Sequence, residues 1–130
     1  MKILHTADWH LGTFRSPVKD GVNLRTEDTK RCLDELIRVA NEEKPDYSIV
    51  SGDIFHVGRL WSDRCCEEII TAIHYIRELA AVSKQVVVMR GTPNHDGSGQ
   101  FNVLSEMFAD VPNVHVVITP QVISFDDVDI

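Results

Sequence analysis

Three short apolar segments mark the predicted strands of this chain. Residues 2–7 read KILHTA, residues 47–51 read YSIVS and residues 85–89 read QVVVM. Each segment is rich in β-branched or other apolar residues, and a Gly or an Asp follows it within two residues. Continuous apolar runs of this length are typical of strands that are buried on both faces of a parallel sheet.

Two longer segments between these strands carry the three-four spacing of an amphipathic helix. They are residues 25–43 and residues 62–82. Thr26 is the predicted cap of the first helix, and Pro45 ends it because the residue before a proline disfavours helical geometry. Ser62 is the predicted cap of the second helix.

The other segments are shorter. Residues 13–24 contain a proline, a glycine and an asparagine, which predicts a turn-rich excursion on the surface. Residues 91–99 form a loop with three glycines, and residues 100–108 a short helix. Residues 114–118 and 122–125 are the predicted fourth and fifth strands.

The order of these elements predicts an α/β fold. A βαβαβ arrangement with helices of crossover length forms a mostly parallel sheet flanked by helices, with right-handed crossovers. Polar side chains follow each of the first three strands: Asp8 and His10, then Asp53, then residues 94–96, which read NHD. Because binding groups in open parallel sheets gather beyond the carboxyl ends of the strands, we expect these three clusters to meet.

Composition limits the classes of function. The chain has 130 residues, the length of one domain, and a net charge of -7. This charge argues against a protein that holds nucleic acid mainly through a basic surface, but a nuclease whose bound cations offset it stays open. The three cysteines form no metal-binding pattern and are expected to be reduced thiols of a cytoplasmic protein. We expect no signal peptide and no membrane span.

The three polar clusters offer oxygen and imidazole ligands. This mixture suits Mn²⁺, Fe or Zn²⁺. Asp53 follows the second of the three strands, where a carboxylate can bridge two ions. Two ions at such a site can activate water and stabilise both the attacking and the leaving oxygen of a phosphodiester. A nearby histidine that binds no metal can protonate the leaving alkoxide, and His95 is the candidate.

The motifs DWHLG, SGDIFH and NHD, in this order and at this spacing, resemble those of the calcineurin-like metallophosphoesterase superfamily. Within it, ILHTADWHLG followed by GDIFH resembles the SbcD-type subunits of DNA-repair nucleases. The resemblance covers nearly the whole chain. It implies metal-dependent phosphodiester hydrolysis on DNA by an exo- or endonuclease.

The resemblance also implies roles for individual residues. Asp8 and His10 would bind the first metal ion, Asp53 would bridge the two ions and Asn94 would bind the second. His95 would be the catalytic histidine. Two further side chains would assist it: Asp96 by orienting His95, and His56 by influencing how the substrate is placed. The implied cofactors are two divalent ions, most favourably Mn²⁺. The implied partners are DNA, a coiled-coil ATPase subunit of SbcC type and a second copy of the chain.

The sequence departs from the family pattern at two places. The family reads GNHD, whereas here Thr92 and Pro93 separate Gly91 from Asn94. The family also completes its site with histidines from a second half, and here His115 is the one histidine that follows His95. We therefore expect residues 1–130 to be the N-terminal portion of a single phosphoesterase domain, without the second half of its four-layer sandwich and with an incomplete ligand set.

Two other functions stay open. One is a different calcineurin-like phosphoesterase that acts on nucleotides or small phosphodiesters. The other is a non-catalytic fragment that folds or docks a partner, which the absent second-half histidines favour.

Overall fold

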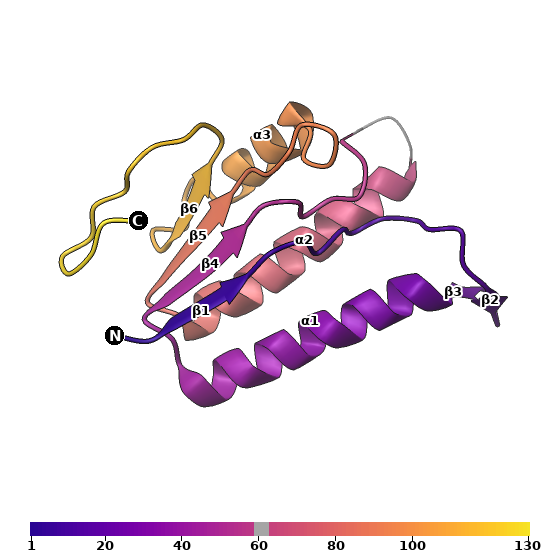
Figure 1. Cartoon of the computed structure of the whole chain (residues 1–130), viewed down its shortest axis with the longest axis horizontal. Coiled ribbons are helices and arrows are strands. Elements are labelled where there is room, and N and C mark those ends of the chain that lie inside the picture. The colour runs from indigo at the N-terminus through magenta and orange to yellow at the C-terminus, as the bar shows by residue number, and fades with distance from the viewer. Residues whose placement is uncertain (59–62) are drawn as a thin grey trace.

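Four parallel strands form the sheet of this protein in a computed structural model that describes residues 1–58 and 63–130. Their spatial order is β1 (Ile3–Thr6), β4 (Tyr47–Ser51), β5 (Gln85–Met89) and β6 (Val114–Val117). The register places Ile3 beside Tyr47 and Tyr47 beside Gln85. Each new strand is therefore added on the same side of the one before it, and β4 lies between β1 and β5 (Figure 1).

Three crossover helices connect these strands: α1 (Leu24–Glu43), α2 (Asp63–Val82) and α3 (Ser98–Met107). Right-handed crossovers that all advance in one direction place their helices on one face of a sheet. α2 packs against both α1 and α3, in agreement with this arrangement (Figure 1). The α/β class, the parallel sheet and the flanking helices that the sequence predicts are confirmed.

The main core lies between the helices and this face of the sheet. Val50, Val86 and Val88 are fully buried on the strands and contact the apolar faces of the helices. Ile76 of α2 and Phe101 of α3 are fully buried in the same cluster. Each side chain of this size contributes roughly 1.5–3 kcal/mol when it is removed from water, so the core fixes the sheet that carries the loops of the site.

The start of α1 differs from the prediction, whereas its end at Glu43 agrees with it. Its cap is Asn23, whose side-chain oxygen accepts hydrogen bonds from the N–H groups of Arg25 (3.1 Å) and Thr26 (3.2 Å). Thr26 lies inside the first turn, and its hydroxyl donates to the carbonyl of Gly12 (3.3 Å). The predicted cap of the second helix, Ser62, lies outside the described residues.

The surface excursion before α1 contains a small hairpin that the sequence analysis did not predict. β2 (Val18–Lys19) pairs with β3 (Val22–Asn23). The turn residues Asp20 and Gly21 have φ values of 52° and 80°. Two consecutive positive φ angles define the type I′ turn of a tight hairpin, and an Asp-Gly pair favours it.

The predicted fifth strand at residues 122–125 is wrong. This segment turns at its acidic end and pairs with the last residues of the chain, through hydrogen bonds between Ile123 and Ile130 in both directions and a single bridge between Ser124 and Asp129. Phe125 packs on the face of the sheet opposite the helices, with its ring centroid 5.3 Å from that of Tyr47. Local pairing therefore replaces addition to the sheet.

Within the described residues, no helix combines the length and the apolar composition that a membrane span requires.

Candidate metal centre

The predicted site residues lie at the carboxyl ends of β1, β4 and β5. Because β4 hydrogen-bonds to both β1 and β5, the three loops that follow these strands leave the sheet side by side (Figure 1). Asp8 and His10 come from the first loop, Asp53 and His56 from the second, and residues 94–96 from the third.

Backbone hydrogen bonds extend the pairing of β1 and β4 into their loops. The N–H of Asp8 donates to the carbonyl of Gly52 (3.0 Å), and the N–H of His10 donates to that of Asp53 (3.0 Å). The next bond joins the Leu11 N–H to the Ile54 carbonyl (2.7 Å). These bonds hold the first two predicted ligands against the third.

The first loop alternates between the site and the core. Asp8 and His10 have φ angles of 56° and 46°, which place both in the left-handed region. Trp9 and Leu11, between and after them, are buried in the hydrophobic core. The indole N–H of Trp9 donates to the Thr6 hydroxyl (2.9 Å). The left-handed residues turn the two polar side chains away from the core, and the buried neighbours anchor the loop.

Asp53, in the second loop, is also left-handed, with a φ angle of 49°. Strained backbone of this kind is concentrated at functional sites.

Asp8, His10 and Asp53 form a group of mixed ligands. Each offers one donor atom, and these atoms all lie within 4.8 Å of one another. Nε2 of His10 is 3.6 Å from Oδ1 of Asp8. Nδ1 of His10 is buried and has no hydrogen-bond partner in the described part of the chain. Two carboxylates and an imidazole at this spacing suit a divalent ion such as Mn²⁺, Fe²⁺ or Zn²⁺, so the residues present fit the metal that the sequence predicts.

The carboxylate of Asp53 is held by Thr92. Its Oδ1 accepts hydrogen bonds from the N–H (2.7 Å) and the hydroxyl (3.0 Å) of Thr92. Burial by itself raises the pKa of Asp53, but these two bonds and the neighbouring His95 and His10 outweigh it and hold the pKa below its usual value. Asp53 is therefore ionised at neutral pH, as a metal ligand must be.

Thr92 is a site residue that the sequence analysis missed. It follows Gly91 directly, which is the position that the asparagine occupies in GNHD, and this position was the available signal. Asn94, the predicted ligand, is exposed, and its carbonyl accepts a hydrogen bond from the N–H of Gly58 (2.9 Å). The role of Asn94 in binding the second ion stays a prediction.

Three histidines meet beside the mixed group. The ring centroids of His10 and His95 are 4.6 Å apart, and that of His56 is 6.1 Å from each. Nδ1 of His95 lies 2.8 Å from the backbone carbonyl of His56. Burial, followed by the neighbouring His10, His95 and Arg25, lowers the pKa of His56. The structure thus brings the predicted catalytic histidine beside His10, which is also a member of the mixed group.

Asp96 joins the second and third loops. It is fully buried, and its two carboxylate oxygens accept hydrogen bonds from the N–H groups of Phe55 (3.0 Å) and Gly91 (2.7 Å). Burial raises the pKa of Asp96 despite these bonds. The contact that orients the His95 ring in the described residues is the one with the His56 carbonyl. That Asp96 also orients this ring stays a prediction.

His115 lies toward the other end of the strands. It is the second residue of β6, and its Nε2 is 2.8 Å from the side-chain oxygen of Gln85, the first residue of β5. It therefore serves as a strand residue and contacts the neighbouring strand rather than the candidate site.

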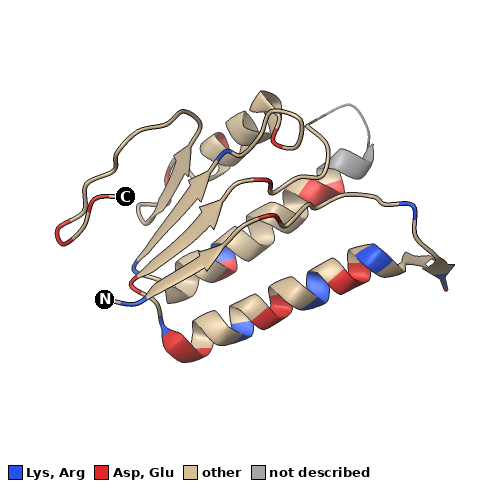
Figure 2. Ribbon diagram, viewed as in Figure 1, with Lys and Arg blue, Asp and Glu red and all other residues tan. Residues whose placement is uncertain are grey.

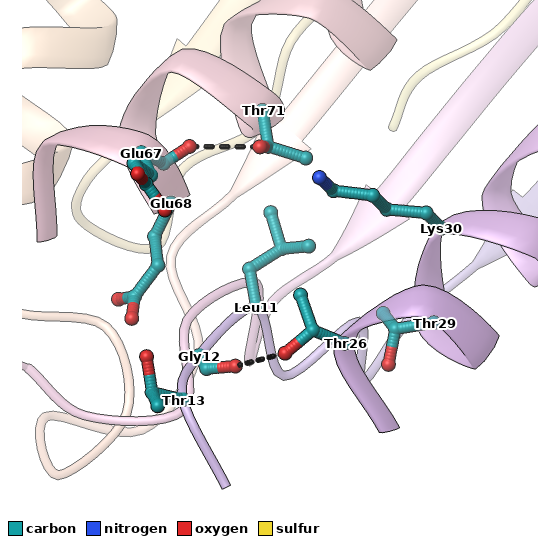
Figure 3. A pocket seen from close by; sticks show the side chains of 9 residues that line it. All are labelled: Leu11, Gly12, Thr13, Thr26, Thr29, Lys30, Glu67, Glu68 and Thr71. Atoms are coloured by element: carbon teal, nitrogen blue, oxygen red, sulfur yellow. Dashed lines mark hydrogen bonds between the residues drawn. The ribbon is translucent and has the colours of Figure 1, made fainter. Parts of the chain in front are cut away.

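A polar pocket adjoins the first loop, where the start of α1 faces the start of α2 (Figure 3). The hydroxyl of Thr71 in its wall donates to a backbone carbonyl of its own helix, that of Glu67 (2.7 Å). The carboxylate of Glu68, which is half-buried, points toward Thr13. Burial raises the pKa of Glu68 to about 7, against the opposing effect of the Thr13 N–H. This pocket therefore adds a titratable group to the fold close to the metal centre.

The sequence of the chain matches a family model. The model for the calcineurin-like phosphoesterases matches residues 1–126. The chain therefore belongs to the calcineurin-like phosphoesterase family, as its motifs predict.

Two relatives in this family are named as nuclease subunits. The chain is 29% identical over 127 residues to the D subunit of nuclease SbcCD from Staphylococcus epidermidis, covering 98% of this chain and 30% of the relative. It is 31% identical over 108 residues to the protein of the same name from Staphylococcus saprophyticus, covering 83% of this chain and 26% of the relative. The chain thus spans less than a third of the length of these relatives.

Proposed function

We propose that this chain supplies metal ligands and a catalytic histidine for the hydrolysis of phosphodiester bonds in DNA. One observation carries the proposal: donor atoms of Asp8, His10 and Asp53 lie within 4.8 Å of one another at the ends of adjacent parallel strands, and the His95 ring contacts the His10 ring there. The names of the two relatives support DNA as the substrate.

In this proposal the ligands divide between two positions. Asp8 and His10 would hold the first ion, Asp53 would serve both ions and Asn94 would hold the second. Bound Mn²⁺ ions would activate a water molecule and stabilise the attacking and leaving oxygens of the phosphodiester. Thr92 supports this arrangement because its two hydrogen bonds keep Asp53 ionised and fixed in position.

His95 acts on the leaving group. A carbonyl oxygen only accepts hydrogen bonds, so the contact with the His56 carbonyl places the proton of neutral His95 on Nδ1. Nε2 is then the atom that gains a proton in the imidazolium form and delivers it to the leaving alkoxide. His56 adjusts substrate placement and Asp96 fixes the loop that carries His95.

The charge pattern supports binding of DNA through the metal centre rather than through a basic face. Lysine and arginine alternate with acidic residues along α1 (Figure 2). Arg38 pairs with Glu35 (2.6 Å) and Glu42 (2.5 Å), and Arg31 pairs with Asp28 (3.5 Å). Arginines that are paired in this way contribute little to a phosphate-binding stripe.

We also propose the domain, partner, oligomeric state and location of the protein. The chain would be the N-terminal portion, residues 1–130, of a single phosphoesterase domain in a subunit of SbcD type. It would act in DNA repair and recombination with a coiled-coil ATPase subunit of SbcC type, as a homodimer in the cytoplasm.

The first experiment is a calorimetric titration of the chain with Mn²⁺. We expect up to two ions per chain and their loss in Asp53→Ala, because a bridging ligand serves both positions. Asp110→Ala, which removes an exposed aspartate that follows α3, is the matched control and should leave binding unchanged. An unchanged titration of Asp53→Ala would overturn the assignment of the site.

The second experiment separates the three functions. Hydrolysis of duplex or single-stranded DNA with Mn²⁺ supports the proposal, provided that His95→Ala binds Mn²⁺ but does not turn over. Preferential hydrolysis of mononucleotide esters would favour the small-substrate phosphoesterase. The non-catalytic role would be supported if a longer chain that includes second-half histidines were active and residues 1–130 alone were not.

A further inference from the structure

His10, His56 and His95 form a second group of donor atoms, distinct from the mixed group. Each offers a ring nitrogen, and the three nitrogens lie within 4.8 Å of one another. The three residues come from three different loops, so their meeting results from the fold and not from a local sequence motif. This group contains no carboxylate, and it shares His10 with the mixed group.

The His95 ring is prepared as a metal ligand. Its Nδ1 donates to the His56 carbonyl at 2.8 Å, which leaves the lone pair on Nε2. A histidine that binds a metal typically donates its other ring N–H to a backbone carbonyl or a carboxylate, which fixes its tautomer and orientation. This contact therefore has the form of an outer-shell interaction at a metal site.

His10, which both groups share, has a polar atom that lacks a hydrogen-bond partner in the described residues. Nδ1 of His10 is buried and, within residues 1–58 and 63–130, has no hydrogen-bond partner. A buried polar atom without a partner loses roughly 1–3 kcal/mol of solvation. Such an atom requires an explanation, and a cation bound at Nδ1 itself would provide one.

The His56 ring is fixed from two sides. The ring of Phe14 lies against it, with centroids 4.3 Å apart. On another side is Gly12, where a Cβ atom would collide with the Cβ of His56. The guanidinium of Arg25 lies over the Phe14 ring, 4.2 Å from its centroid, and holds that ring in turn. The packing thus holds the imidazole of His56 beside the other two rings.

We propose that His10, His56 and His95 form an all-nitrogen metal position that prefers Co²⁺, Ni²⁺ or Zn²⁺ to Mn²⁺. Imidazole ligands suit these ions, and their affinity for a given site exceeds that of Mn²⁺. Because the position uses His10 and His95, filling it withdraws a metal ligand and the catalytic histidine from the proposed reaction. This consequence, an inhibitory metal position, rests on the proposed function, whereas the binding itself does not.

The test is a titration of the purified chain with Co²⁺, followed by visible absorption and calorimetry, beside a titration with Mn²⁺. His56→Ala should weaken Co²⁺ binding at least tenfold, because even the loss of an outer-shell partner costs roughly 10–100-fold in affinity, and should leave Mn²⁺ affinity within about twofold. Asp8→Ala should do the reverse and keep the cobalt spectrum. His10→Ala should weaken both.

Two further variants serve as a control for surface binding and as a second test of the position of His56. His74→Ala removes an exposed histidine of α2 and should leave the cobalt spectrum unchanged, which excludes binding at this surface histidine. Gly12→Ala displaces His56 without removing it and should weaken Co²⁺ selectively. Circular dichroism confirms folding of each variant.

Equal Co²⁺ binding by the wild type and His56→Ala would overturn the all-nitrogen position. A wild type that binds Co²⁺ as expected but does not bind Mn²⁺ would leave this position intact and instead contradict the proposed function. The two failures are therefore distinguishable.

Discussion

Gly91 lies close against Asp53, and Gly91→Ala tests this packing. A Cβ atom on Gly91 would collide with the backbone nitrogen and Oδ1 of Asp53 and would lie 3.0 Å from Oδ2 of Asp96. Backbone atoms cannot rotate away as the end of a side chain can. The ends of β4 and β5 must therefore separate, or Asp53 must move.

The expected loss follows from this geometry. Overpacking typically costs about 1–3 kcal/mol, and contact with backbone places this variant near 3 kcal/mol. For a chain of this length such a loss lowers Tm by roughly 10 °C. Displacement of Asp53 from Thr92 should also weaken Mn²⁺ binding at least tenfold, as loss of an outer-shell contact does.

Gly21→Ala is the matched control. Gly21 has a φ of +80°, but a Cβ atom there would meet nothing within 4 Å. This variant carries only the left-handed strain of about 1 kcal/mol, with no effect on the metal centre. Urea denaturation measures stability, and calorimetry measures Mn²⁺ affinity. The close packing of Gly91 against Asp53 would be refuted if Gly91→Ala were no less stable than Gly21→Ala and bound Mn²⁺ like the wild type.

Three other substitutions test contacts around the site. Because the pKa of Glu68 is raised to about 7, the folded state binds its proton more tightly than the unfolded state. The free energy of unfolding should thus fall by on the order of 1 kcal/mol from pH 4.5 to 7, a value reduced because Glu68 is partly exposed. Urea denaturation at a series of pH values measures this fall, and Glu68→Gln should abolish it. Tyr75→Phe removes the hydroxyl that donates to Asp34 (2.7 Å) and should cost about 1–2 kcal/mol in thermal unfolding; an unchanged Tm would contradict this contact. Trp9→Phe removes the N–H that donates to Thr6. The free energy of Mn²⁺ binding, measured by calorimetry, should fall by more than the free energy of unfolding does.

The sheet and the helices could be predicted because their signals are local. The segments at 47–51 and 85–89 are continuous apolar runs, and the strands have these bounds. The segment at 122–125 has a similar apolar character, yet its partner is the end of the chain. Periodicity indicates that a segment can be extended, but it does not identify the segment with which it pairs.

The membership of the site was also predictable in part. Topology places strand ends together, which is sufficient to gather Asp8, His10 and Asp53. The bond from His95 to the His56 carbonyl and the two bonds from Thr92 to Asp53 depend on the paths of loops. Loop paths follow from tertiary packing, so the sequence held no signal for the His95 contact and only the place of Thr92 directly after Gly91 as a signal for the other two.

The left-handed backbone at Asp8, His10 and Asp53 has a consequence for the evolution of the protein. Each of these residues is less stable in this conformation than glycine would be, by about 1 kcal/mol. Asp8→Gly should therefore relieve strain in the metal-free protein while it removes a predicted metal ligand. Selection for thermal stability alone would favour glycine at these three positions and would remove the side chains that offer the donor atoms.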